Sequence, residues 1–183
     1  MMTSSASLRV AVVGATGAVG AEMIKVLERR NFPVGSLKPL ASARSTGRTV
    51  AFRGRQVPVE VLGEASFAGV DLALFSAGGG ISKTYAPVAV RAGCTVVDNS
   101  SAFRADPQVP LVVPPLNAAD ALEHHGIVAN PNCTTAITLM ALFPLHRAFG
   151  CRRIFASSYQ AMSGTGAKAI EELKRQVEEI VSG

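Results

Sequence analysis

The sequence has few of the residues that mark a secreted, membrane-spanning or metal-binding protein. Its 183 residues include no tryptophan and only three cysteines, Cys94, Cys133 and Cys151. An odd number of widely spaced cysteines favours neither a disulfide framework nor a zinc site, and it fits a reducing cytoplasm. No apolar run approaches the roughly 20 residues that a membrane span requires. Residues 1–7 lack the basic and then apolar segments of a signal peptide, so we expect a cytoplasmic protein with no membrane or metal partner.

Dense basic clusters and stacking aromatic residues, which nucleic-acid-binding proteins use, are also scarce. The chain carries 18 Lys and Arg against 13 Asp and Glu, a formal net charge of +5, but the basic residues are scattered. Aromatic residues make up only 5% of the chain, so we expect no nucleic-acid partner. The positive charge suits anionic small molecules such as phosphates. Hydrophobic residues, at 48%, are numerous enough for a sizeable core.

The first 30 residues predict a dinucleotide-binding unit. Residues 8–13 form a run rich in β-branched side chains, typical of a buried strand, and residues 21–30 place apolar side chains at helical spacing. Gly14, Gly17 and Gly20 lie between them, spaced GxxGxxG rather than the better-known GxGxxG. In such a turn the glycines permit the tight bend, the approach of a pyrophosphate to the helix N-terminus, and the packing of helix on strand. A tight turn without a ligand is the alternative, but the strand and helix on either side favour a nucleotide site.

A basic loop after the second predicted strand, residues 36–41, indicates which nucleotide binds. An NAD site usually carries Asp or Glu there for the ribose 2′-hydroxyl. This chain instead has Ser42-Ala43-Arg44-Ser45-Thr46-Gly47-Arg48. Arginine and hydroxyl side chains suit a 2′-phosphate, so the sequence predicts NADP, with an ordinary basic loop as the alternative.

Further strands alternate with helices and predict a parallel, doubly wound sheet. We expect strands at 71–75, 95–98 and 126–129, a hairpin within 49–62, and a helix at 85–92 with Pro87 in its first turn. Ligands bind at the carboxyl ends of the strands in such sheets. The loops that begin at Ser76 and Asn99 are therefore candidate binding loops.

Arg104, in the second of these loops, is a candidate anion clamp. A guanidinium group binds carboxylate or phosphate through two parallel hydrogen bonds. The alternative is an ordinary surface salt bridge, the more common use of a single arginine.

Cys133 is the candidate nucleophile. It follows the turn-forming residues Pro131 and Asn132 and precedes an apolar run, residues 136–143, that predicts a buried helix. At the start of that helix, free N–H groups and the positive end of the helix dipole would stabilise a thiolate. A small buried cysteine without chemistry is the alternative.

Six motifs, in this order, resemble those of the N-terminal half of aspartate-semialdehyde dehydrogenase. They are Val12-Val13-Gly14-Ala15-Thr16-Gly17-Ala18-Val19-Gly20, Ser42-Ala43-Arg44-Ser45, Phe75-Ser76-Ala77-Gly78-Gly79, Asp98-Asn99-Ser100-Ser101-Ala102-Phe103-Arg104, Asn130-Pro131-Asn132-Cys133-Thr134-Thr135 and Gln160-Ala161-Met162-Ser163-Gly164. The resemblance runs from about Val10 to the end of the chain. N-acetyl-γ-glutamyl-phosphate reductase shares the chemistry, but that family has glycine before its cysteine and an aromatic residue soon after. Asn132-Cys133-Thr134 fits the semialdehyde enzyme better.

The resemblance implies that aspartyl β-phosphate is reduced by NADPH to aspartate β-semialdehyde, with release of phosphate. Cys133 would form a thioester with the substrate, and hydride transfer would then release the aldehyde. Arg104 would hold the substrate or the departing phosphate, with Asn99 a weaker candidate, and Gln160 would contact the substrate. The implied cofactor-binding residues are Gly14, Thr16, Gly17, Ala18 and Val19 at the pyrophosphate, Arg44 and Ser45 at the 2′-phosphate, Ser76, Ala77 and Gly78 in the next loop, and Ser163 and Gly164 near the nicotinamide.

The resemblance also implies two domains. A Rossmann-type NADP-binding domain of α/β class would occupy residues 8–135, and the beginning of an α+β substrate and dimerisation domain would occupy residues 136–183. In the second part we expect a strand at 152–160 and an amphipathic helix at 168–181.

The family continues past Gly183 with a histidine general acid/base and most of the substrate domain. The resemblance therefore implies that these 183 residues alone are not a competent enzyme, and that the full-length form is a homodimer. We expect His124, His125 and His146 to be surface or packing residues rather than replacements for that base. A nucleotide-binding module without turnover is the remaining alternative.

Overall fold

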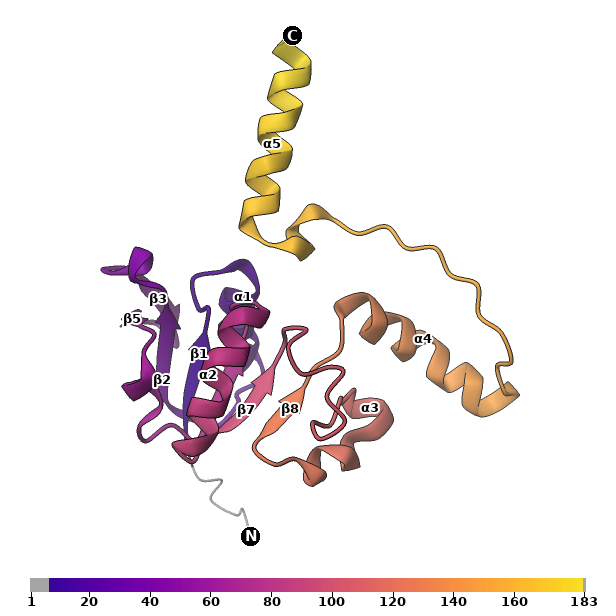
Figure 1. Ribbon diagram of the computed structural model, residues 1–183, viewed down its shortest axis with the longest axis horizontal. Coiled ribbons are helices and arrows are strands. Elements are labelled where there is room, and N and C mark those ends of the chain that lie inside the picture. The colour runs from indigo at the N-terminus through magenta and orange to yellow at the C-terminus, as the bar shows by residue number, and fades with distance from the viewer. Residues whose placement is uncertain (1–6, 183) are drawn as a thin grey trace.

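A sheet of six parallel strands lies at the centre of the first 130 residues (Figure 1). The computed structural model describes residues 7–182. The strands lie in the order β5-β2-β1-β6-β7-β8, and all five neighbouring pairs are parallel. Their bounds are β1 Leu8–Val13, β2 Val34–Ala41, β5 Glu60–Val61, β6 Leu72–Phe75, β7 Thr95–Asp98 and β8 Ile127–Ala129. The order reverses beside β1, which is where such sheets bind ligands, and the predicted doubly wound fold is confirmed.

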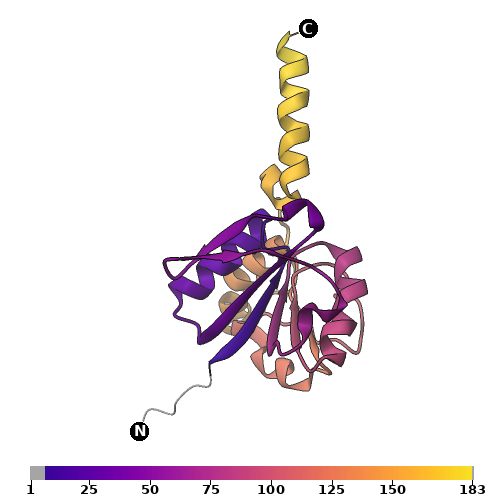
Figure 2. The same ribbon diagram turned by 90° about the vertical axis from the view of Figure 1, so that its left-hand side faces the viewer.

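Helices α1 (Ala18–Arg29) and α2 (Gly79–Arg91) cover opposite faces of this sheet (Figure 2). Side chains alternate along β1, so Val10 and Val12 pack in one core cluster with residues of α1. Ala11 and Val13 pack in the other cluster with residues of α2. These four β1 side chains are fully buried, because helices cover both sides of the strand.

Helix α2 begins at Gly79, six residues earlier than the sequence predicts. The expectation that Pro87 lies in the first turn is therefore wrong, and Pro87 lies inside the helix. Glycine has low helix propensity, so the segment Gly79-Gly80 gives little sequence signal for a helix start. Tertiary contact decides the start instead, because Ser82 is fully buried and donates a hydrogen bond of 2.6 Å from its hydroxyl to Asp98 Oδ1 on β7.

The predicted hairpin is confirmed as β3 (Thr49–Phe52) and β4 (Arg55–Pro58), which pair antiparallel. Its two-residue turn, Arg53-Gly54, has positive φ at both positions, as a type I′ turn requires. The remaining short helices are η1 Ala43–Ser45, η2 Glu64–Phe67, α3 Pro114–Asn117, η3 Ala118–Glu123 and η4 Met162–Thr165.

The second part of the chain has two long helices, α4 (Cys133–Phe149) and α5 (Ala167–Ser182). Residues 150–161 between them have no helix or strand, so the strand predicted at 152–160 is wrong. A strand needs a neighbour to bond its backbone N–H and C=O groups, and residues 7–182 provide none beside this segment. Figure 1 shows it as an extended connection, with α5 projecting away from the sheet.

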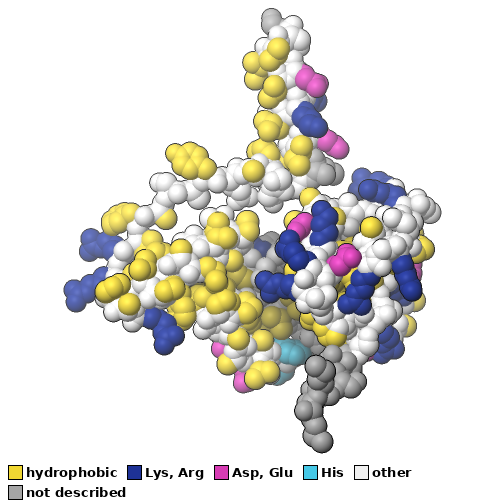
Figure 3. All heavy atoms as spheres, turned by 180° about the vertical axis from the view of Figure 1, so that it is seen from behind, with side chains coloured by type: hydrophobic (Ala, Val, Ile, Leu, Met, Phe, Trp, Pro, Cys, Tyr) yellow, Lys and Arg dark blue, Asp and Glu magenta, His cyan; other side chains and the backbone are white. Residues whose placement is uncertain are grey.

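Both helices present apolar side chains to solvent, seen in yellow in Figure 3. The expectation that the helix after Cys133 is buried is therefore wrong, because no residue of α4 is buried. On α4 these include Ile137 and Phe149, which are 69% and 83% exposed, and on α5 they include Ile180, which is 81% exposed. Exposed apolar surface of this extent is typical of a contact face. No helix within residues 7–182 combines the length and apolar character that crossing a membrane requires.

Candidate active site

The glycine turn after β1 is held by close backbone packing. Gly14 has a φ of +86°, and a Cβ at that position would lie 2.6 Å from the carbonyl oxygen of Ser76. A Cβ at Gly20 would collide with the carbonyl oxygen of Gly14. Gly17 caps the N-terminus of α1, and its N–H donates to the Gly14 carbonyl over 3.0 Å. The turn therefore places the first N–H groups of α1, at Ala18 and Val19, at the carboxyl end of β1, where a phosphate is favoured.

The structure joins the glycine turn to the basic loop. Thr16 Oγ1 lies 3.1 Å from Ser45 Oγ, within hydrogen-bond distance, and Ser45 is buried in η1. Arg44 and Arg48 in the same loop are exposed. Within the described residues neither arginine pairs with a carboxylate. A contact between two hydroxyl groups therefore joins the predicted cofactor turn to a loop that carries two guanidinium groups without a carboxylate partner.

The loop after β6 lies against the same turn. The N–H of Ser76 donates to the Val13 carbonyl over 2.9 Å, and the close approach of Gly14 brings Ser76 and Ala77 beside the first glycine. Gly78 then caps α2. These contacts place Ser76 and Ala77 beside Gly14, and Gly78 follows them in the chain.

Arg104 lies at the ends of β7 and β8, held by two backbone carbonyls. Its Nε donates to the Asn130 carbonyl over 2.9 Å, and its Nη2 donates to the Asn99 carbonyl over 2.8 Å. Within residues 7–182 no carboxylate forms a salt bridge with Arg104, so the surface ion pair weighed from the sequence is wrong. The carbonyls orient the guanidinium but leave its positive charge uncompensated.

Cys133 is the first residue of α4, and it is exposed. Asn132 is the N-cap, and its Oδ1 accepts from the N–H of Thr134 at 2.9 Å and of Thr135 at 3.4 Å. The expectation of a buried Cys133, which was the alternative, is therefore wrong. Cys94 fits that description instead, because burial, and then the nearby Asp71 carboxylate, raise the pKa of its thiol to about 11.

Gln160 reaches the start of α4 from the irregular segment. Thr134 Oγ1 donates to Gln160 Oε1 over 3.2 Å, which brings Gln160 to the residue after Cys133. Gly164, in η4, lies against the Gln160 side-chain amide. No hydrogen bond among the described residues joins Ser163 or Gly164 to the glycine turn.

Asp98 and Asn130 are two residues of the site that the sequence did not single out. Asp98 is fully buried, and its carboxylate accepts from the hydroxyls of Ser82 and Ser100 at 2.6 and 2.7 Å. Asn130 donates from Nδ2 to Asn99 Oδ1 over 2.6 Å. The sequence does carry a signal for Asp98, because this aspartate ends an apolar strand and the serines two and three positions later offer local hydroxyl donors.

None of the three histidines forms a hydrogen bond with Cys133 within residues 7–182. His146 is in the last turn of α4, at the end opposite Cys133, where its Nδ1 accepts from the N–H of Cys151 at 3.2 Å. His124 Nδ1 accepts from the N–H of Gly126, before β8 begins. The interpretation of these residues as packing or surface groups is confirmed for His124 and His146, which both make local backbone contacts. Within residues 7–182 no group of His, Cys, Asp and Glu could hold a metal ion.

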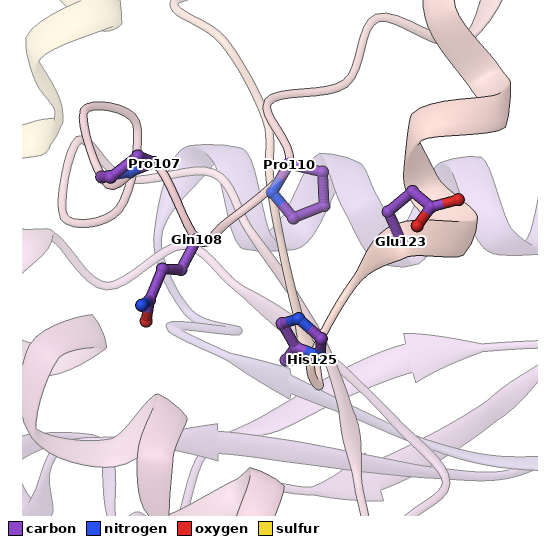
Figure 4. A pocket seen from close by; sticks show the side chains of 5 residues that line it. All are labelled: Pro107, Gln108, Pro110, Glu123 and His125. Carbon is purple, nitrogen blue, oxygen red and sulfur yellow. The ribbon is translucent and has the colours of Figure 1, made fainter.

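A cavity of about 500 Å³ lies elsewhere, in the connection between β7 and β8 (Figure 4). The residues that line it are Pro107, Gln108, Pro110, Glu123 and His125. None of these five residues is among the predicted site residues.

Comparison with known proteins identifies related sequences over nearly the whole chain. A profile of the semialdehyde dehydrogenase NAD-binding domain matches residues 9–125, and a profile of the semialdehyde dehydrogenase dimerisation domain matches residues 142–183. The chain is 54% identical over 181 residues to an aspartate-semialdehyde dehydrogenase of Legionella pneumophila, covering 98% of this chain and 52% of that protein. It is 51% identical over 175 residues to the Bacillus subtilis protein of the same name, covering 96% and 51%.

Solved structures show the same relationship. The crystal structure of aspartate semialdehyde dehydrogenase II of Vibrio cholerae complexed with ASA superposes with a TM-score of 0.92 at 45% identity, covering 98% of this chain and 54% of that one. A probable aspartate-semialdehyde dehydrogenase of Pseudomonas aeruginosa gives a TM-score of 0.84 at 32% identity, covering 96% and 53%. The chain thus spans about half the length of the curated relatives it matches.

Proposed function

The chain belongs to the semialdehyde dehydrogenase family, and from this premise we propose that its whole protein is an NADP-dependent, phosphorylating aspartate-semialdehyde dehydrogenase. The proposed reaction reduces aspartyl β-phosphate to aspartate β-semialdehyde and releases phosphate. The names of relatives at 54% and 51% identity support the substrate. The observation that carries the proposal is the gathering of an exposed Cys133, an unpaired Arg104 and Gln160 at the ends of β7 and β8.

Cys133 is the proposed nucleophile. Its thiolate attacks the acyl carbon, a C–S bond forms, and the C–O bond to phosphate breaks, so that a thioester and free phosphate result. Because Cys133 is exposed at the start of a helix of 17 residues, it is open to the substrate and near the positive end of the helix dipole. NADPH, when bound, supplies the hydride that converts the thioester to the aldehyde and returns the thiolate.

Arg104 is the proposed binding group for the phosphate or the substrate carboxylate. A guanidinium carries five N–H donors, and two of them are used on the carbonyls of Asn99 and Asn130. The other donors and the uncompensated charge remain for an anion. Gln160, held beside Thr134, is the proposed second substrate contact, and Asn99 is a weaker one because its side-chain oxygen already accepts from Asn130.

The residues around the glycine turn fit a dinucleotide. Close packing at Gly14 and Gly20 leaves no room for side chains where the pyrophosphate would approach α1. Arg44 and Ser45, with no acidic residue in positions 42–48, favour the 2′-phosphate of NADP over the free hydroxyl of NAD. We assign Gly14, Thr16, Gly17, Ala18, Val19, Ser76, Ala77 and Gly78 to the same cofactor site, and Ser163 and Gly164 to its nicotinamide side.

The proposed domain division places the NADP-binding domain at residues 8–135 and the beginning of the catalytic and dimerisation domain at 136–183. The match of residues 142–183 to a dimerisation domain supports a homodimer of the whole protein. The exposed apolar faces of α4 and α5 supply surface for that contact.

The 183 residues by themselves are proposed to have little turnover. Within residues 7–182 no histidine hydrogen-bonds Cys133, and His124 and His146 instead accept from the N–H groups of Gly126 and Cys151. General acid–base catalysis typically contributes about 10²- to 10⁴-fold. A steady-state assay with aspartate semialdehyde, phosphate and NADP⁺, read as NADPH absorbance, tests two statements. The first is that the whole protein has the proposed activity, and the second is that the 183 residues alone have little of it. The whole protein should turn over and its Cys133→Ser variant should not, while the isolated 183 residues should be at least about 100-fold slower. Equal rates for the two wild-type proteins would overturn the second statement, and no turnover by the whole protein would overturn the first.

A further inference from the structure

The cysteine turn and the Arg104 loop are joined by a closed ring of three hydrogen bonds. Asn130 Nδ2 donates to Asn99 Oδ1 over 2.6 Å, Arg104 Nε donates to the Asn130 carbonyl over 2.9 Å, and Arg104 Nη2 donates to the Asn99 carbonyl over 2.8 Å. Each of the three residues bonds both others. All three are half-buried, so water competes with these bonds less than at an open surface.

Asn130 differs from the other two residues of the ring because it lies where the pairing of β8 with β7 ends. Its N–H donates to the Asp98 carbonyl over 2.8 Å, continuing the pairing of β7 with β8 by one residue. Pro131 follows and has no N–H to continue the pairing. Asn130 is therefore the last residue before Cys133 that is bonded to β7, and its side chain joins the turn that leads to the nucleophile to Asn99, the residue after β7.

The ring also fixes the orientation of Arg104. Two bonds from one planar guanidinium to two carbonyls determine the plane of the group, and one of the two acceptors belongs to Asn130. A shift of Asn130 would therefore move the arginine and the cysteine turn together.

We propose that Asn130 is a positioning residue that holds the Arg104 charge and the Cys133 turn in one fixed arrangement by bonding Asn99 with its side chain and Arg104 with its carbonyl. This assignment rests on the proposed function, because it gives Asn130 a purpose at the anion site proposed for Arg104. In this assignment the Asn99 carboxamide oxygen serves mainly to accept the hydrogen bond from Asn130 rather than to bind substrate.

The test measures the charge that Cys133 experiences. Iodoacetate is anionic and iodoacetamide is neutral, and both alkylate the same thiolate. The rate with iodoacetate divided by the rate with iodoacetamide at Cys133, measured by peptide mass spectrometry, therefore rises when a cation is held near the sulfur. In the wild-type chain we expect this ratio to exceed the ratio for the same cysteine in the urea-unfolded chain by about 3- to 5-fold.

The variant Asn130→Ala should lower that ratio to within about twofold of the unfolded value while the circular dichroism spectrum stays that of a folded chain. Asn99→Ala removes the same hydrogen bond, between the Asn130 and Asn99 side chains, by deleting the acceptor. It therefore tests the positioning role if Asn130→Ala does not fold. Since both substitutions remove one contact, the double variant should show no further loss.

Asn117→Ala is the matched control. The Asn117 side chain makes three hydrogen bonds, with Val113, Leu111 and Asp120, but Asn117 lies in α3, in the connection between β7 and β8. Its loss should affect stability and leave the Cys133 ratio unchanged. Cys151, an exposed thiol in the same molecule, should keep its own ratio in every variant.

A folded Asn130→Ala chain with the wild-type ratio would overturn the positioning role and leave the proposed function standing. A wild-type ratio equal to that of the unfolded chain has a different meaning. It would show that no cation acts on the Cys133 sulfur, and it would contradict both the proposed role of Arg104 and the role of Asn130.

Discussion

The Thr134 hydroxyl donates a hydrogen bond of 3.2 Å to Gln160 Oε1, joining residues that are 26 positions apart in the sequence. The bond brings Gln160 next to the nucleophile turn, although no strand or helix carries it there. Gly164 lies against the other end of the same amide, at Gln160 Nε2. The position of Gln160 therefore depends on the absence of a side chain at residue 164.

The variant Gly164→Ala should displace the Gln160 amide and weaken the reaction without unfolding the protein. The added Cβ would overlap the Gln160 Nε2, which is the far end of a flexible side chain and can move. We expect kcat/KM of the whole protein for aspartate semialdehyde to fall by about 10-fold or more, because misplacement of a substrate contact by 1 Å is costly. The melting temperature should stay within a few degrees. In a Gln160→Ala background, where the collision is absent, Gly164→Ala should have no further effect on kcat/KM, and an equal loss there would contradict this explanation.

The variant Arg44→Ala should lower the preference for NADP⁺ over NAD⁺. A charge-assisted hydrogen bond to a phosphate contributes about 1.5–3 kcal/mol, so NADP⁺ affinity should fall by at least about 10-fold while NAD⁺ affinity changes little. Titration calorimetry with both nucleotides measures the two affinities. Arg30→Ala removes the same charge from the C-cap of α1, at the far end of the helix from the glycine turn, and should leave the ratio unchanged. An equal loss of both affinities in Arg44→Ala would show that Arg44 does not read the 2′-phosphate.

The variant Gly20→Ala should destabilise the fold, whereas Gly80→Ala should not. A Cβ on residue 20 would collide with the Gly14 carbonyl, which is backbone and cannot rotate away, so we expect a loss of about 2 kcal/mol or more in the free energy of unfolding. Gly80 lies in the first turn of α2 with no atom within 4 Å of an added Cβ, and alanine favours a helix. Urea titration of both variants gives the comparison, and equal unfolding midpoints would contradict the close packing at Gly20.

The contact between Arg9 and Asp71 should make stability depend on pH in the acid range. The hydrogen bonds from Arg9, first from its side chain and then from its N–H, lower the pKa of the Asp71 carboxyl to about 2. A group whose pKa is lower in the folded state stabilises the fold above the unfolded pKa of about 3.9, and this contribution is lost as pH falls toward 2. Because the pair is exposed, we expect a small effect. Urea midpoints of the wild type should exceed those of Asp71→Asn at pH 6 and approach them at pH 2.5, and a gap of constant size would contradict the linkage.

Local patterns of residues predict much of this fold. The β-branched run at 8–13 and the three glycines specify a buried strand and a tight turn, because both depend on residues adjacent in sequence. The same holds for Cys133, since the turn-forming residues before it and the apolar run after it fix the start of α4. The strand expected at 152–160 shows the limit of such patterns. Those residues have strand-like composition, but a strand forms only where another strand can pair with it.

The sequence by itself determined which groups the chain offers for chemistry: the glycine turn, Arg44, Arg104, Cys133 and Gln160. Only the tertiary structure decided how they meet. Asn99 and Asn130 lie 31 residues apart, and they bond because β7 and β8 are neighbours in the sheet. Ser82, which donates to the buried Asp98, belongs to α2 because that helix begins six residues earlier than its own sequence indicates. Such contacts depend on strand order and on the packing of helices across the sheet, which are properties of the whole folded chain and not of any local stretch.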